Sequence, residues 1–126
     1  FVKKIKENKK IKLYNNGNHF RDFTYIDDVT KILKKLIYLK PKNKVPYQIY
    51  NVASGNKIKI KKLIKVLEKL IGKDSKNIKQ KQKMGDVYKT HADVSKIRKK
   101  LGLIEKKTNN LENNLKKYID WYDDFY

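Results

Sequence analysis

The chain has 126 residues and a formal net charge of +20, from 33 basic residues against 13 acidic ones. This length suits a single domain or a piece of a larger protein. It contains no cysteine, which excludes disulfides and cysteine-ligated metal sites. No stretch has the length and composition of a membrane span or the order of a signal peptide. We therefore expect a cytoplasmic protein without a membrane anchor.

The positive charge is mainly a bias toward lysine, because the chain has only two arginines, Arg21 and Arg98. Nucleic-acid sites use arginine wherever planar, bidentate contacts are made. The lysines are spread along the whole chain, which is typical of solvated faces. We therefore do not expect nucleic acid as the partner. A lysine-rich module that binds nucleic acid or an acidic polymer stays open as an alternative of another class.

The first elements are predicted to be short. Phe1–Glu7 has the pattern of a helix end, and Ile11–Tyr14 is β-prone. The "NNGN" stretch at 15–18 is a turn signal. A second β-prone run covers Phe23–Ile26.

A helix is expected next, capped at its N-terminus by Asp27 or Asp28. Pro41 and Pro46 follow it and mark its exit. Its apolar face consists of Val29, Ile32, Leu33, Leu36 and Ile37.

The middle of the chain predicts a strand, a turn and the clearest helix. Tyr47–Val52 ("YQIYNV") is typical of a strand, and Ala53–Asn56 ("ASGN") of a turn. The helix is expected to end at Gly72, because glycine readily adopts the left-handed conformation found after helices. Its apolar stripe consists of Ile60, Leu63, Ile64, Leu67, Leu70 and Ile71.

The last third predicts one extended run and two helices. Ile78–Gln82 is expected to be extended and Met84–His91 to be loop. Asp93 is expected to cap a short helix that stops at Gly102. A closing helix has Leu111, Leu115, Tyr118, Ile119 and Tyr122 on one face. The alternation of strands and helices predicts an α/β fold.

Three sequence patterns do not indicate a metal, catalytic or dinucleotide site. The two histidines, His19 and His91, have no carboxylate at ligand spacing, so we interpret them as ordinary surface or loop residues. Tyr38 and Lys42 match Tyr-x-x-x-Lys, but Pro41 between them would break the helical turn that this pair needs. The five glycines do not form G-x-G-x-x-G, so no dinucleotide-phosphate loop is present.

Two loops combine a cation with a tight turn. Arg21 follows Gly17, and Lys83 precedes Gly85 in the stretch 81–93. These cations beside tight turns suit a pyrophosphate ligand, because a guanidinium can hold two of its oxygens at once. A plain surface ion pair of Arg21 is the alternative. Aromatic residues that would suit a base lie nearby in sequence: Tyr14, Phe23 and Tyr88.

Four stretches resemble the extended short-chain dehydrogenases that act on nucleotide sugars. They are residues 1–33 with "RDFTYIDD", 50–56 ("YNVASGN"), 85–102 with "GDVYKTHADVSK", and the ending 111–126. The resemblance is nearest to the UDP-glucuronate 4-epimerases, which are often encoded with capsule or lipopolysaccharide genes.

The resemblance implies that residues 1–126 are the C-terminal, substrate-binding portion of such an enzyme, built of small mixed sheets with helices. The N-terminal Rossmann half, which binds NAD and supplies the catalytic tyrosine and lysine, is not in this chain. We therefore expect no bound cofactor and no catalytic residue here, and no activity from the chain alone. The intact enzyme is expected to be a homodimer.

The resemblance also implies residues that bind a UDP-sugar. Leu13 and Tyr14 correspond to positions that line the uracil ring. Arg21 corresponds to the arginine that holds the diphosphate, and Phe23 to its aromatic neighbour.

Three further positions come from the second loop. Asp86 corresponds to an acid near the ribose, and Thr90 to the position that sets the room around the sugar. Lys83 stands where many relatives have a second phosphate-binding arginine; a lysine keeps the charge but not the planar fork. The implied reaction is oxidation and reduction at sugar C4. A nucleotide-sugar 4,6-dehydratase or reductase of the same family is the nearer alternative.

Overall fold

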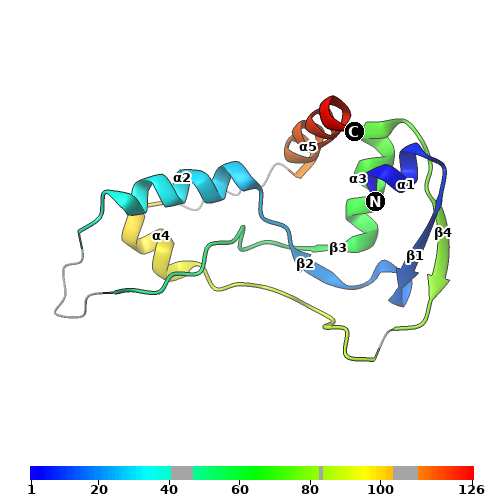
Figure 1. Cartoon of the computed structure of the whole chain (residues 1–126). Helices are drawn as coiled ribbons and strands as arrows, with labels where there is room; N and C mark the ends of the chain where they lie inside the picture. Colours follow the sequence, from blue (N-terminus) through cyan, green and yellow to red (C-terminus); the bar gives the residue numbers. More distant parts are fainter. Residues whose placement is uncertain (41–46, 83, 104–110) are drawn as a thin grey trace. The chain divides into compact units, whose positions relative to one another are not determined.

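The computed structural model describes residues 1–40, 47–82, 84–103 and 111–126. It divides into two compact units (Figure 1). The first unit comprises Phe1–Arg21, Lys57–Thr90 and Asn110–Tyr126, and the second comprises Asp22–Asn56 and His91–Asn109.

Helices and a two-stranded parallel sheet make up most of the first unit (Figure 1). Strand β1 (Lys10–Tyr14) pairs in parallel with β4 (Lys76–Gln80), with Lys10 opposite Lys76 and Tyr14 opposite Gln80. The helices are α1 (Val2–Lys6), α3 (Ile60–Ile71) and α5 (Leu111–Phe125). A second small sheet joins β2 (Phe20–Asp22) and β3 (Lys57–Lys59). The predicted α/β class is confirmed.

Helix α3 is at the centre of the first unit, because it contacts both α1 and α5. Its predicted apolar stripe places three side chains in the core, Leu63, Ile64 and Leu67. The other buried apolar residues of this unit are Val2, Ile5, Ile11, Leu13 and Ile119. Gly72 ends the helix with φ of 72°, as its position in the sequence predicts.

The turn between β1 and β2 is formed by the short 3-10 helix η1 (Asn15–Gly17). Asn15, Asn16 and Gly17 all have positive φ, which asparagine and glycine tolerate better than other residues. A Cβ on Gly17 would lie 3.2 Å from the backbone nitrogen and Cβ of Lys61. The predicted turn is therefore confirmed, and it leads the chain past the start of α3, where the Ile60 amide donates to the His19 carbonyl.

The second unit contains α2 (Ile26–Ile37) and α4 (Ser95–Leu101). Its buried apolar residues among those described are Val94 and Ile97. Helix α2 has an apolar face, but none of its residues is fully buried, and Leu33 and Ile37 are exposed. The Asp22 carboxylate accepts hydrogen bonds from the backbone amides of Ser54, Gly55 and Ala92.

The structure corrects the predicted strand at Phe23–Ile26. The strand lies earlier, at Phe20–Asp22, and α2 begins at Ile26. Residue Tyr25 precedes the helix without a side-chain cap, so the prediction that Asp27 or Asp28 is the cap is wrong. Both aspartates lie in the first turn instead, where a negative charge favours the helix N-terminus.

The predicted strand at Tyr47–Val52 is also not formed, since these residues carry no strand assignment. Tyr47 and Ile49 are 69% and 72% exposed. A strand requires the backbone of a neighbouring strand, and the described part of the chain provides none here. Pro41 and Pro46, which were predicted to mark the exit of the preceding helix, lie outside the described residues.

The last third follows the prediction more closely. The extended run is β4, which lies two residues earlier than predicted, and α4 and α5 form as expected. The N-cap of α4 is Val94, so the prediction that Asp93 is the cap is wrong, although an oxygen of Asp93 accepts the Ser95 amide at 2.9 Å. Hydrogen bonds from the backbone amide and the side chain of Ser95 lower the pKa of the Asp93 carboxyl. No helix among the described residues has the length and apolar character to cross a membrane.

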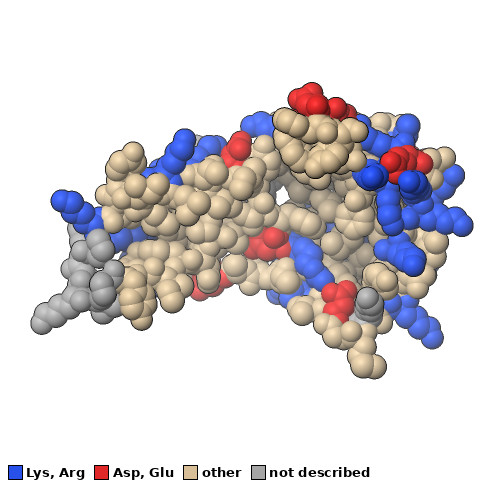
Figure 2. All heavy atoms as spheres, in the orientation of Figure 1, with Lys and Arg blue, Asp and Glu red and all other residues tan. Residues whose placement is uncertain are grey.

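Lysine and arginine atoms are scattered over the face shown in Figure 2, with neutral surface between them. The interpretation of the lysines as solvated faces stays a prediction.

Candidate functional site

The candidate site forms where the loop after β4 runs beside β2 in the first unit. The Phe20 amide donates to the Tyr88 carbonyl at 3.0 Å, and the Thr90 amide donates to the Phe20 carbonyl at 3.2 Å. Phe20 and Lys89 form an isolated parallel bridge. This pairing holds the second predicted loop against the segment that carries Arg21, although the two are far apart in the sequence.

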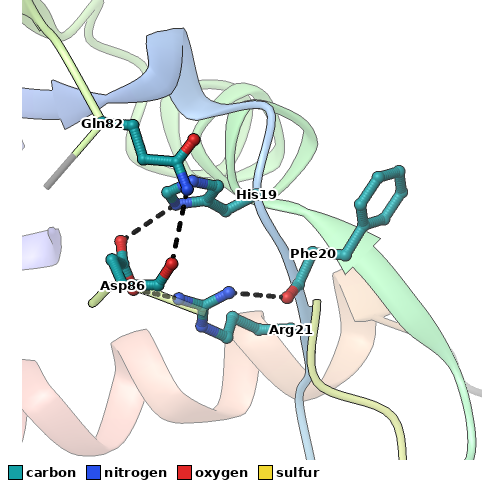
Figure 3. Close-up of polar contacts among 5 residues, drawn as sticks. All are labelled: His19, Phe20, Arg21, Gln82 and Asp86. Atoms are coloured by element: carbon teal, nitrogen blue, oxygen red, sulfur yellow. Dashed lines mark hydrogen bonds and ion pairs between the residues drawn. The ribbon is translucent and has the colours of Figure 1, made fainter. Parts of the chain in front are cut away.

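Arg21 forms a half-buried ion pair with Asp86 (Figure 3). Its Nη2 donates to Oδ1 of Asp86 at 2.8 Å, and its Nη1 donates to the Phe20 carbonyl at 2.8 Å. The two side chains are 26% and 30% exposed. These bonds use two of the five N–H donors of a guanidinium and fix its plane. The ion pair considered as an alternative therefore exists, but it is not a loose surface contact.

His19 is the second partner of Asp86. Its Nδ1 lies 3.1 Å from Oδ2 of Asp86, so the two carboxylate oxygens are held by different side chains (Figure 3). The His19 ring packs edge-on against Tyr88, with ring centres 5.8 Å apart. The residue is only 3% exposed, so the interpretation of His19 as a surface histidine is wrong, although it does lie in the irregular segment before β2.

Strand alternation provides the signal that could have identified His19. Residues i and i+2 of an extended segment point to the same side. His19 and Arg21 stand in this relation, and both side chains reach Asp86 (Figure 3). The amide of Gln82 adds a longer contact of 3.4 Å to the Asp86 backbone carbonyl.

Three lysines lie around Phe20, the residue before Arg21. The Lys59 ammonium lies 5.3 Å from the centre of the Phe20 ring. Lys57 lies against Lys89, and this contact between like charges lowers the pKa of Lys89. A polyanion would relieve the repulsion between Lys57 and Lys89, so the charges near Phe20 favour an anionic ligand.

The remaining predicted site residues are distributed differently. Leu13 is buried in the core on β1, and Tyr14 is half-buried at the end of that strand. Thr90 is exposed and belongs to the segment paired with Phe20. Phe23 is half-buried in the second unit, so its place relative to Arg21 is not described. Lys83 lies outside the described residues.

The described residues contain no group of three or more histidine, cysteine, aspartate or glutamate side chains that could hold a metal ion. His91 contacts the Gly55 carbonyl through Nε2 at 3.0 Å and is exposed.

Comparison with known proteins gives a consistent set of similarities. Residues 1–53 match the family described as the NAD dependent epimerase/dehydratase family. The chain is 38% identical over 122 residues to the UDP-glucuronate 4-epimerase of Thermodesulfobacterium geofontis, covering 96% of this chain and 36% of that protein. It is 34% identical over 139 residues to UDP-glucuronate 4-epimerase 1 of Arabidopsis thaliana, covering 100% of this chain and 32% of that protein.

The fold is similar to a solved structure of UDP-glucuronic acid 4-epimerase from Bacillus cereus in complex with UDP-glucuronic acid and NAD. The TM-score is 0.82 at 26% identity, covering 99% of this chain and 38% of that one. The predicted short-chain dehydrogenase type of fold is thus confirmed. The chain spans between 31% and 41% of the length of the curated relatives it matches.

Proposed function

Since this chain belongs to the NAD-dependent epimerase/dehydratase family, we propose that it is the C-terminal, substrate-binding portion of a nucleotide-sugar 4-epimerase. UDP-glucuronate is the first candidate substrate, because the relatives and the solved structure named above are UDP-glucuronate 4-epimerases. We further propose a cytoplasmic homodimer that makes precursors of surface polysaccharide, as the sequence resemblance implies.

The observation that carries the proposal is the fixed guanidinium of Arg21. Asp86 and the Phe20 carbonyl hold its plane, while the side chain stays a quarter exposed. A planar donor with N–H groups left for a ligand suits a diphosphate, which presents several oxygens at once. Lys59 lies over the ring of Phe20, the residue before Arg21, and Lys57 lies beside Lys89, so this part of the unit carries further positive charge.

The other predicted residues have roles in the same site. Leu13 and Tyr14 would line the uracil ring, and Asp86 would lie near the ribose while it holds Arg21. Phe23 would be the aromatic neighbour of Arg21. Lys83 would give a second contact to the phosphates, and Thr90 would set the room around the sugar.

This chain anchors the nucleotide in the proposed reaction. Inversion at C4 by oxidation and reduction requires the sugar ring to turn over while the nucleotide stays in place. Contacts remote from the reacting carbon supply that fixed point and its binding energy. NAD would supply the redox chemistry, but none of the five glycines of this chain lies in a G-x-G-x-x-G loop. The residues here do not fit a dinucleotide, and we assign NAD and the catalytic residues to the part of the enzyme outside this chain.

The test compares the intact protein with the 126-residue chain. We expect the intact protein to convert UDP-glucuronate to UDP-galacturonate in the presence of NAD. Chromatography of the nucleotide sugars measures this conversion. The chain alone is expected to give no turnover and to bind no NAD, because it lacks a phosphate loop and a suitable Tyr-x-x-x-Lys pair. Turnover by the chain alone would contradict this division of roles.

Two further assays separate the alternatives. A 4,6-dehydratase would release water and yield a 4-keto-6-deoxy sugar from a UDP-hexose. A nucleic-acid-binding module would bind a random DNA duplex, with an affinity that falls steeply as salt is raised. Either result in place of epimerisation would replace the proposed function.

Thr90→Tyr in the intact protein is expected to lower activity on UDP-glucuronate about tenfold more than activity on UDP-glucose. A threonine leaves space beside the sugar and offers a hydroxyl that can donate or accept a hydrogen bond. A tyrosine would fill that space and clash with the substituent of a substituted sugar. The measurement is kcat/KM on both substrates. Thr30→Tyr, on the exposed side of α2, is the matched control and should change neither value. Parallel losses on both substrates would show that Thr90 does not set the room around the sugar.

A further inference from the structure

His19 is a buried polar side chain to which the proposed function gives no role. It is 3% exposed, although it lies just before the short strand β2. It contacts Asp86 through Nδ1, while Nε2 is buried and has no hydrogen-bond partner in the part of the chain that the structure describes. A buried polar side chain with an unused hydrogen-bonding atom requires an explanation, and a role in the neighbouring site is one.

We propose that His19 is a positioning residue for nucleotide binding: it fixes the Asp86 carboxylate, which in turn orients the Arg21 guanidinium toward a diphosphate. The inference rests on the proposed function and adds a residue to that site. His19 itself would not touch the ligand, because its ring is covered.

The loop that carries Asp86 has little packing of its own. Its neighbours Met84 and Val87 are 102% and 58% exposed, and Gly85 has φ of 82° with open space around its α-carbon. The orientation of Asp86 must therefore come from specific contacts rather than from burial in a core. Among the described residues these are His19, Arg21 and the weaker contact from Gln82 (Figure 3).

The histidine can act as a fixed donor because its own ring is held. Its edge-on packing against Tyr88 and its position at the end of the asparagine-rich turn leave the ring little freedom. With the proton on Nδ1, the ring donates to Asp86 and leaves only a bare acceptor unpaired at Nε2. The opposite tautomer would place an unpaired N–H donor in the interior and a lone pair against a carboxylate. The geometry thus favours donation from His19 to Asp86.

Each carboxylate oxygen then has its own donor, Oδ1 from Arg21 and Oδ2 from His19. Without His19 the carboxylate can rotate or turn toward solvent, and Arg21 loses one of its two fixed contacts. Ligand binding must then also order the guanidinium, which reduces affinity.

The test is calorimetric titration of the intact protein with UDP. His19→Phe keeps a ring against Tyr88 but removes the donor, and we expect its dissociation constant to rise about tenfold, as removal of a partner behind a binding group commonly does. His19→Asn can place an amide N–H near the position of Nδ1 and should stay within about threefold of the natural protein. His91→Leu, which changes the exposed histidine, is the matched control and should bind UDP normally.

A double variant distinguishes positioning from a general loss of stability. If His19 acts through Asp86, His19→Phe should have no further effect on UDP binding in an Asp86→Ala background. Equal UDP binding by His19→Phe and the natural protein, or additive losses in the double variant, would overturn the inference. If His19→Phe does not fold, His19→Leu takes its place in the same cycle. Failure of the natural protein to bind UDP would instead overturn the proposed function.

Discussion

Arg21→Lys in the intact protein is expected to weaken UDP binding by about 1–3 kcal/mol, or roughly 5- to 150-fold in dissociation constant. Lysine keeps the charge, but it loses the planar fork that can hold Asp86, the Phe20 carbonyl and phosphate oxygens together. A lysine ammonium would also not hold Asp86 as the Arg21 guanidinium does, so Asp86 would lose one of its two side-chain partners. The measurement is calorimetric titration with UDP at fixed salt.

Lys65→Ala is the control for a general loss of positive charge. Lys65 is an exposed residue of α3, and a screened surface charge contributes well under about 1 kcal/mol. We expect UDP to bind this variant almost normally. Equal and small effects of Arg21→Lys and Lys65→Ala would show that the arginine is not needed as a bidentate donor.

Asp22→Ala is expected to lower the free energy of unfolding by about 2–4 kcal/mol, because hydrogen bonds to a charged group are among the stronger ones in proteins. The carboxylate accepts the amides of Ser54 and Gly55 and the hydroxyl of Ser54, and a longer contact comes from Ala92. Alanine removes the acceptor of the Gly55 amide, while the Ser54 amide keeps only its contact of 3.2 Å with the Thr24 hydroxyl. The measurement is urea denaturation, with hydrogen exchange of residues 53–56 to localise the effect.

Asp22→Asn is the matched variant for this prediction. It keeps one acceptor oxygen but presents an amide N–H₂ to at least one of the backbone donors, so its loss should be smaller than that of Asp22→Ala. Asp124→Ala, on the exposed surface of α5, should leave stability nearly unchanged. If Asp22→Ala unfolds at the same urea concentration as Asp124→Ala, the carboxylate does not hold the 54–55 turn.

The sequence predicted correctly those elements that depend on residues close together in the chain. Helix α3 has an unbroken apolar stripe and a glycine at its end, and it forms where expected. The turn at Asn15–Gly17 follows from residues that tolerate positive φ. Such features are encoded within a few residues, so they can be read without knowledge of the rest of the chain.

The strands were predicted less well, because strand formation depends on a partner elsewhere. Tyr47–Val52 has strand composition but no partner backbone among the described residues, and it remains irregular. The run at Phe23–Ile26 is β-prone, yet the pairing with β3 involves Phe20–Asp22 instead. Pairing between distant segments decided both outcomes.

The site was predictable only in part for the same reason. The rarity of arginine drew attention to Arg21, and resemblance to a family suggested Asp86. Their contact spans 65 positions in the sequence and depends on the pairing of Phe20 with the 88–90 segment. His19 was missed because an isolated histidine carries no motif, and its burial follows from the turn and from Tyr88.

The most direct test of the central claim is a crystal structure of the intact protein with UDP bound. The account predicts that oxygens of the diphosphate lie within hydrogen-bonding distance of the Arg21 guanidinium while Arg21 keeps its contact with Asp86. It also predicts that His19 Nδ1 stays within hydrogen-bonding distance of Asp86. A diphosphate bound elsewhere, with Arg21 engaged only by Asp86 and the Phe20 carbonyl, would contradict it.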